Sequence, residues 1–208
     1  MKALEIDHLP YLCSFASGCA GFVSLLIAAG GVLSPSDGRP TVCVMADNRP
    51  CGIPFDLLRE RILRSDHSSA FLVGPQEGGY QLLGLSYYST ARKLVPLVEI
   101  VKRTVEMIQD LAADLGLDLT QNDVALHYPN TFPDTWKMVT RYLRIEGAEH
   151  IMEGMADRAH CGASDSVISL SQHYAGQRGR LHVVVNYGVG LHLGVCILKE
   201  SDMGEPGL

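Results

Sequence analysis

Residues 15–22 read F-A-S-G-C-A-G-F, a run of small residues around Cys19 that leads directly into the apolar segment S-L-L-I-A-A-G-G-V-L. Small residues ahead of an apolar run indicate a turn that enters a helix, which we expect over residues 20–33. A cysteine at a helix start lies at the positive end of the helix dipole, which favours a thiolate. On these local grounds Cys19 is either an activated nucleophile or, as is more common, a small buried residue.

The rest of the chain alternates apolar runs with amphipathic stretches. Apolar residues recur every three or four positions over 94–115, which is the clearest helix pattern in the sequence. Further helices are expected after Pro133 and over 164–174, and strands over 9–17, 41–46, 69–74, 80–89, 124–128, 181–186 and 191–199. Strands that alternate with helices indicate an α/β fold with a largely parallel sheet. The continuous apolar run at 41–46 is typical of a central strand covered on both faces.

Composition excludes several classes of protein. The 208 residues, 47% of them hydrophobic, suffice for one domain or two small fused halves. No apolar stretch approaches the roughly 18 residues that span a bilayer. A net charge of −6 gives no positive electrostatic field that would attract nucleic acid. The six cysteines lack CxxC spacing, so we expect reduced thiols in a cytoplasmic protein. A-S-G-C is similar to a lipoprotein cleavage site, but the apolar segment such a site needs follows Cys19 instead of preceding it.

Three further stretches carry residues suited to chemistry. His127 ends a predicted strand in H-Y-P-N, and the carboxyl ends of strands are where α/β sheets place ligands. The turn A-H-C-G-A-S-D-S holds His160 and Asp165, whereas the adjacent His160 and Cys161 point apart and no zinc-like spacing completes a metal site. The glycines of Y-G-V-G-L-H-L-G allow close approach to a ligand but would also suit a plain hairpin. Each stretch by itself has an ordinary structural explanation.

Taken in order, these stretches resemble the thiolase superfamily, and within it the ketoacyl synthase III type. C-A-G-F at residues 19–22 is similar to the family's nucleophile motif, and H-Y-P-N at 127–130 is similar to its His-Gln-x-Asn motif. Residues 66–70 lie where the family has a glycine-rich turn and keep its Asp. Y-G-V-G at 187–190 resembles the family's Phe-Gly-Gly-Gly loop.

The resemblance covers residues 10–199 and implies a thiolase-like, layered α-β-α-β-α fold with two similar halves, here 1–90 and 91–208. Roughly the first third of the family's chain has no counterpart, so we expect an incomplete first half. An incomplete sheet exposes a strand edge that a partner chain or a second copy would cover. In the family the strand before the nucleophile pairs across a two-fold axis, so residues 9–17 are expected at the interface of a homodimer or of a heterodimer with a homologous subunit.

The third motif bears on the activity. Condensing members have an Asn where a gap-free alignment places His160, and a Ser where it places Asp165. A His followed five residues later by an Asp resembles the branch that moves acyl groups to oxygen or nitrogen. The resemblance therefore implies an acyltransferase whose donor is acyl-CoA or the phosphopantetheine of an acyl carrier protein, with no permanently bound cofactor and no metal. The alternatives are a decarboxylative condensing enzyme and a non-catalytic partner subunit.

The same resemblance implies roles for single residues. Cys19 attacks the thioester, and the backbone N–H groups of Cys19 and Val189 hold the oxyanion. His127 deprotonates the acceptor, assisted by His160 and Asp165. The supporting positions are Asn130, Gly188 and Gly190. The arginines Arg59, Arg61 and Arg64 could meet a CoA phosphate, and a solvated basic face explains them as well.

Overall fold

The computed structural model describes residues 18–32, 38–48, 62–75, 78–90, 95–188 and 190–201. The helices are α1 (Gly21–Val32), α2 (Leu97–Asp114), α3 (Pro133–Leu143), α4 (Met155–Arg158) and α5 (Ser164–Gln172), with 3-10 turns η2 (Gly18–Ala20) and η3 (Leu119–Gln121). The strands are β1 (Thr41–Asp47), β2 (His67–Val73), β3 (Gly79–Ser89), β4 (Val124–His127), β5 (Glu149–Ile151), β6 (Leu181–Gly188) and β7 (His192–Ser201).

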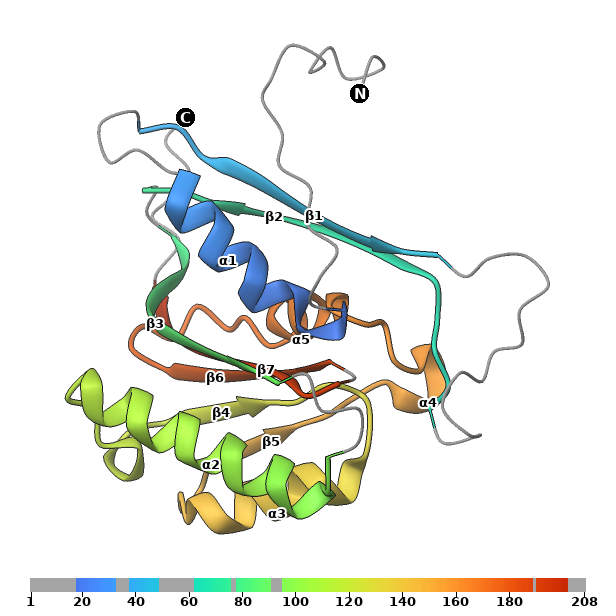
Figure 1. Ribbon diagram of the computed structural model, residues 1–208. Helices are drawn as coiled ribbons and strands as arrows, with labels where there is room; N and C mark the ends of the chain where they lie inside the picture. The colour runs from blue at the N-terminus through green and yellow to red at the C-terminus, as the bar shows by residue number, and fades with distance from the viewer. Residues whose placement is uncertain are drawn as a thin grey trace.

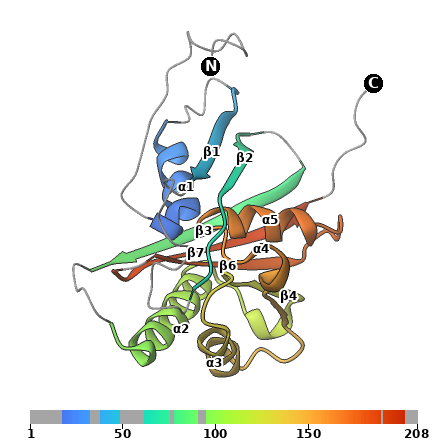
Figure 2. The ribbon, with the colours of Figure 1, turned by 90° about the vertical axis from the view of Figure 1, so that its right-hand side faces the viewer.

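These elements form stacked layers (Figure 1). From the top of that view, the layers are the pair β1 and β2, then α1 with α5, then a five-stranded sheet, then α2 with α3. The view turned by 90° shows the same stacking (Figure 2). These are four of the five layers expected from the sequence. The described residues form no helical layer on the outer face of β1 and β2.

The larger sheet has the strand order β3-β7-β6-β4-β5. β4 runs parallel to β5 and β6, whereas β7 runs antiparallel to β6 and β3. The sheet is therefore mixed instead of largely parallel, because β6 and β7 are consecutive strands joined by a tight connection. The division predicted between residues 90 and 91 would leave β3 in the first half, whereas its pairing with β7 puts it in the sheet of the second half.

Both faces of the larger sheet are buried. Val183 and Val185 on β6 point into the core beneath the sheet, which includes Ile108 of α2 and Trp136 of α3. Val184 points to the opposite face, into the core that α1 and α5 cover. Burial on both faces explains why the strands of this sheet are nearly continuous apolar runs.

The smaller sheet differs from its prediction. β1 was expected to be covered on both faces, but only Cys43 and Met45 are buried, whereas Val42 and Val44 on the other face are 64% and 60% exposed. β1 pairs antiparallel with β2, so Val42 lies directly opposite Leu72, which is 64% exposed. Within the described residues this sheet therefore presents a bare apolar outer face.

Most predicted elements are confirmed to within a few residues, and α2 follows the 94–115 pattern closely. The short elements β5 and α4 were not predicted, because three or four residues carry too little periodicity to recognise. The predicted strand at 9–17 lies outside the described residues. Among the described helices, none has the length and apolarity needed to cross a membrane.

The packing of α1 on β7 can be tested at Gly194. A Cβ at this position would lie 2.7 Å from the Cβ of Val23 on α1, so Gly194→Ala should push α1 away from the sheet. We expect the free energy of unfolding to fall by about 1–3 kcal/mol in urea titrations. Gly30→Ala is the matched control because nothing lies within 4 Å of a Cβ there. Equal stability of the two variants would contradict this packing.

Candidate active site around Cys19, His160 and Asp165

The nucleophile position is fixed by the entry into α1. Cys19 is the central residue of η2, which continues directly into α1 and packs against β6 and β7. Its side chain is partly exposed. Gly21 allows the turn that carries His160 to approach, since a Cβ there would lie 3.1 Å from the Cβ of Ala163. The predicted turn-to-helix position of Cys19 is confirmed.

The structure brings Cys19 together with His160 and Asp165. The imidazole of His160 has its Nδ1 2.6 Å from Oδ2 of Asp165, and Cys19 is close enough to the ring to raise the pKa of His160. His160 and Asp165 are 2% and 3% exposed. Burial by itself would lower the pKa of His160, but the hydrogen bonds to Asp165 and Cys19 and the charges on both raise this pKa to about 9. Because Nδ1 faces Asp165, Nε2 is the ring nitrogen that remains for another partner.

The Asp165 carboxylate is held by four donors. Oδ2 accepts from His160 and from the backbone N–H of Asn130 at 2.9 Å. Oδ1 accepts from Arg158 Nη1 at 2.6 Å and from the backbone N–H of Cys161 at 3.1 Å. Burial tends to raise the pKa of Asp165, but the hydrogen bond to His160, its charge and the backbone donors lower it. The carboxylate is therefore ionised and fixed in orientation.

The backbone of the turn that carries His160 is clamped by residues 63–65. The His160 N–H donates to Leu63 O and the Ser65 N–H donates to His160 O, each at 3.0 Å. Ala159 has a φ of +54°, a left-handed conformation that costs a non-glycine residue about 1–3 kcal/mol. The Asn130 side chain stabilises it by donating to Ala159 O at 3.1 Å. Asn130 therefore supports the turn through both its backbone and its amide.

A second histidine packs against this turn. His67 on β2 has its Nδ1 2.8 Å from Ser164 Oγ, and Ser69 Oγ lies 2.7 Å from the same oxygen. Gly162 has a φ of +54°, and a Cβ there would lie 2.5 Å from His67 Nε2. The described strands of the smaller sheet thus hold the turn that carries His160 by direct contact.

Tyr187 approaches Cys19 from β6. Burial, followed by the charge of Cys19, raises the pKa of Tyr187. Its ring packs edge-to-face with Phe132, at a centroid separation of 6.1 Å, and also meets Trp136. Tyr187 therefore belongs to an aromatic cluster with Phe132 and Trp136 and is close enough to Cys19 to respond to its charge.

His127 lies in a different network. Its Nδ1 is 2.7 Å from Ser169 Oγ and its Nε2 is 2.9 Å from Nδ1 of His182. His182 Nε2 in turn lies 3.0 Å from Glu200 Oε2. Burial, then the charges of neighbouring groups with His182 first, hold the pKa of His127 well below its ordinary value. Because both ring nitrogens are engaged in the core, this geometry does not support the expected role of His127 as the base at Cys19.

Of the remaining predicted positions, three lie within the described residues and three lie outside them. Gly188 ends β6, Gly190 has a φ of +93°, and Arg64 pairs with Asp47. The positions outside the described residues are Val189, Arg59 and Arg61. The described part of the chain contains no group of three His, Cys, Asp or Glu residues able to hold a metal ion.

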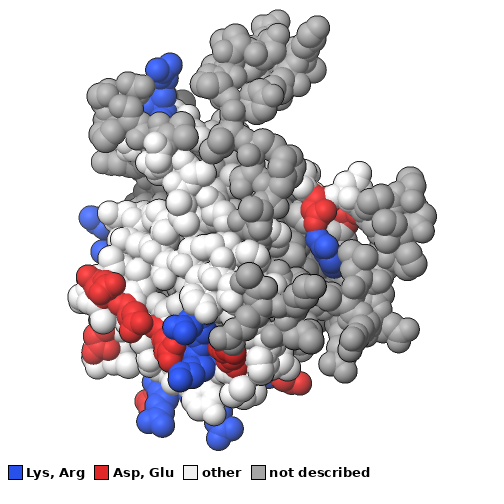
Figure 3. Space-filling view, in the orientation of Figure 1, with Lys and Arg blue, Asp and Glu red and all other residues white. Residues whose placement is uncertain are grey.

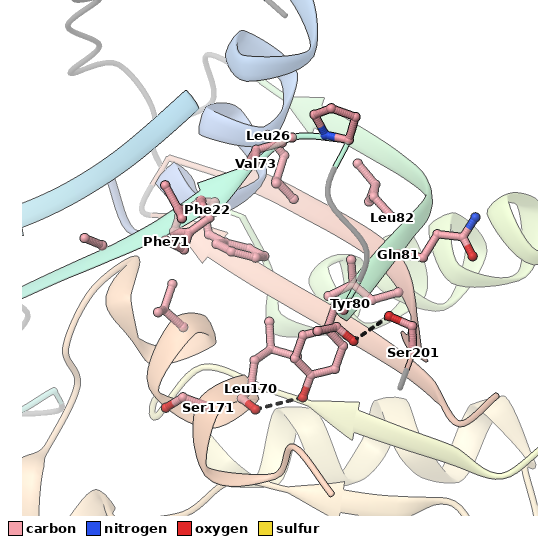
Figure 4. A pocket seen from close by; sticks show the side chains of 18 of the residues that line it. Phe22, Leu26, Phe71, Val73, Tyr80, Gln81, Leu82, Leu170, Ser171 and Ser201 are labelled. Atoms are coloured by element: carbon pink, nitrogen blue, oxygen red, sulfur yellow. Dashed lines mark hydrogen bonds between the residues drawn. The ribbon is translucent and has the colours of Figure 1, made fainter. Parts of the chain in front are cut away.

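A groove of about 1230 Å³ lies between α1, β2, β3 and α5 (Figure 4). Its lining includes Phe22, Leu26, Phe71 and Leu170, with Tyr80 donating to Leu170 O at 2.8 Å on its floor. Among the described residues, the trio around Cys19 does not contribute to this lining. The groove is therefore separate from the candidate active site.

Several residues of the site were missed from the sequence. Arg158, His67 and Tyr187 stand in no recognisable motif, and only the short distance of Arg158 from His160 along the chain offered a signal. The contacts of His67 and Tyr187 come from long-range packing between strands and turns. Spacing along the sequence does not reveal such contacts.

No family model matches the sequence, and no curated protein matches it by sequence. Solved structures match its fold. ChlB3, described as an acyltransferase, aligns at 20% identity with a TM-score of 0.68, covering 89% of this chain and 66% of ChlB3. The chain has a thiolase-like fold.

Two further thiolase-like structures align over most of the chain. One is 3-oxoacyl-(acyl-carrier-protein) synthase III from Aquifex aeolicus, at 16% identity and a TM-score of 0.67, covering 95% of this chain and 70% of that one. The other is 1,3,6,8-tetrahydroxynaphthalene synthase from Streptomyces coelicolor, at 13% identity and a TM-score of 0.71, covering 96% and 67%. This chain thus spans about two thirds of the thiolase-like chains it matches, as the sequence resemblance predicted.

The buried histidine network makes stability depend on pH. His127 and His182 both have lowered pKa values in the folded state, with burial as the first cause. Unfolding lets them bind protons below their unfolded value of about 6.5, so the free energy of unfolding rises with pH up to that value. Replacing His127 with Gln removes one such group. The slope between pH 5 and 6.5 should fall by up to about 1.4 kcal/mol per pH unit.

Urea titrations at several pH values measure this slope. His192→Gln, at a half-buried histidine outside the network, is the control. His160 acts in the opposite direction, since its raised pKa contributes stability that is complete below about pH 6.5 and is lost as the pH rises through about 9. An unchanged acid slope in His127→Gln would show that His127 is not a buried neutral histidine.

Proposed function

We propose that this thiolase-like chain is an acyltransferase that works through a thioester on Cys19. The single observation that carries the proposal is the buried pair of His160 and Asp165, whose Nδ1 and Oδ2 lie 2.6 Å apart, beside Cys19, whose interaction with the imidazole raises the pKa of His160. A cysteine paired with a histidine that a carboxylate orients is an arrangement for nucleophilic catalysis. The donor class, acyl-CoA or acyl carrier protein, and a cytoplasmic location come from the sequence resemblance and stay predictions.

In the first half-reaction His160 serves as the acid. The Cys19 thiolate attacks the carbonyl carbon of the donor thioester, and a new carbon–sulfur bond forms. The oxyanion of the tetrahedral intermediate is stabilised by backbone N–H groups, with those of Cys19 and Val189 as the candidates from the sequence. The bond to the donor sulfur then breaks, and the departing thiolate takes the proton from the His160 imidazolium.

In the second half-reaction neutral His160 serves as the base. It takes the proton from the hydroxyl or amine of the acceptor as that atom attacks the Cys19 thioester. The carbon–sulfur bond breaks, the acyl group leaves on the acceptor, and Cys19 returns as the thiolate beside imidazolium. His160 thus takes the role that the sequence resemblance gave to His127, whose two ring nitrogens contact Ser169 and His182.

Acyl transfer is favoured over decarboxylative condensation by what His127 and Asn130 bind. Condensation requires side-chain donors that hold the carbonyl of the second thioester as its enolate forms. In the described part of the chain, Asn130 donates its amide hydrogens to Glu153 O and Ala159 O, and His127 contacts Ser169 and His182. Neither side chain points a donor at Cys19, whereas His160 is arranged as a base.

Intact-mass analysis after mixing with acetyl-CoA, octanoyl-CoA and the matching acyl carrier proteins tests the proposal. We expect an acyl adduct on the wild-type chain, none on Cys19→Ala, and formation slowed about hundredfold in His160→Gln. His127→Gln is the matched control and should form the adduct at close to the wild-type rate. A large loss in His127→Gln together with normal acylation of His160→Gln would contradict the assignment of the base.

A second candidate function, a partner subunit, is favoured by the bare face of the smaller sheet. Val42, Val44 and Leu72 form a contiguous apolar patch on it, and exposed patches of this kind mark protein contacts. The groove beside β2 is also mainly apolar (Figure 4). Charged side chains gather instead over α2 and α3 in the lower part of the molecule (Figure 3).

Light scattering tests whether this face pairs chains. We expect the wild-type chain to dimerise or to bind a homologous subunit, and Val44→Glu to weaken that association by placing a charge in an apolar contact. Val98→Glu, on α2 away from this face and 68% exposed, is the control. A wild-type chain that stays monomeric and does not bind the homologue would remove this candidate.

A further inference from the structure

The amide of Asn186 joins the two helices that build the site. Asn186 is on β6 and is 2% exposed. Its Oδ1 accepts from the backbone N–H of Val23 at 3.2 Å, one of the N–H groups near the start of the nucleophile helix that need an acceptor. Its Nδ2 donates to Ser166 Oγ at 2.5 Å, on the helix that carries Asp165.

The orientation of this amide is fixed by its partners. Nδ2 also lies 3.4 Å from Val185 O, an acceptor that only the nitrogen end of the amide can satisfy. The oxygen must therefore face Val23. A flipped amide would set two donors, Nδ2 and the Val23 N–H, against each other inside the core.

Two glycines allow the elements around Asn186 to approach one another closely. Gly194 on β7 leaves room for Val23, whose Cβ would lie 2.7 Å from a Cβ at that glycine. Gly21 does the same for Ala163, which directly precedes α5. α1, β6 and α5 thus meet at contact distance around one buried amide.

We propose that Asn186 is a positioning residue for the reaction, because its amide sets the nucleophile helix against the helix that carries Asp165 and so aligns Cys19 with His160. This inference rests on the proposed function. Asn186 touches none of the reacting groups itself. It acts through Val23, four residues after Cys19, and through Ser166, the residue after Asp165.

The pH dependence of Cys19 alkylation reports this alignment. As a general rule, an imidazolium beside a thiol favours the thiolate near neutral pH, whereas at pH 10 a thiol ionises without that help. Among the described residues, the titratable groups that interact with Cys19 are His160 and Tyr187, and those that interact with His160 in turn are Asp165 and His67. Poor alignment should therefore slow alkylation at pH 7 and leave it unchanged at pH 10.

The experiment follows iodoacetamide labelling of the Cys19 peptide by mass spectrometry in the full chain. We expect Asn186→Ala to be about tenfold slower than wild type at pH 7 and equal at pH 10. Ser166→Ala, which removes one arm of the contact, should show a smaller loss with the same pH pattern. Asn122→Ala and Ser171→Ala are matched controls at exposed positions and should behave as wild type.

Two outcomes would overturn the inference: unchanged pH 7 rates in both folded variants, or losses that persist equally at pH 10. If Asn186→Ala does not fold, Ser166→Ala decides by the same criteria. Alkylation needs no acyl donor, so this test is separate from the proposed function. Absence of a wild-type adduct with every acyl-CoA and acyl carrier protein tested would remove the acyltransferase. A normal adduct, together with alkylation that does not respond to the substitutions at Asn186 and Ser166, would remove only the positioning role.

Discussion

The buried carboxylate of Asp165 is the constraint on which the site depends. A carboxylate with almost no exposed surface is costly unless hydrogen-bond donors surround it, and here the backbone after β4, the end of α4, the turn at Cys161 and the ring of His160 all supply one. Satisfying this one group therefore ties residues 158–161 to the start of α5 and to Asn130 after β4. The orientation and charge of His160 follow from that arrangement.

The strained backbone of the turn is supported by the same contacts. Ala159 in a left-handed conformation and Gly162 beside His67 would be unfavourable in an isolated loop. The amide of Asn130, the strand-like pairing with residues 63–65 and the packing of His67 hold the turn in place. The described part of the smaller sheet, which follows α1 in the chain, therefore also clamps the turn that carries His160.

Much of this arrangement could be predicted from the sequence, and its failures have physical reasons. The small residues around Cys19 fixed its place before α1, and the five-residue interval from His160 to Asp165 matched their contact. The partners of His127 could not be predicted, because position at a strand end says nothing about the direction of a ring. The ring here contacts His182, which in turn contacts Glu200, both more than fifty residues later in the chain. β1 was expected to be covered because its residues form a continuous apolar run. Such a run indicates that a strand is buried, but it does not show whether this chain or another one covers it.

The central claim is that His160, and not His127, is the imidazole coupled to Cys19. Long-range ¹H–¹⁵N NMR of the histidine rings as a function of pH tests it most directly, with His160→Gln and His127→Gln providing the assignments. We expect the ring of His160 to titrate with a pKa of about 9, and this pKa should fall in both Asp165→Asn and Cys19→Ala. The ring of His127 should stay neutral throughout the neutral pH range. A His160 ring that titrates at or below about 6.5 and does not respond to Cys19→Ala, beside a His127 ring that does respond, would contradict it.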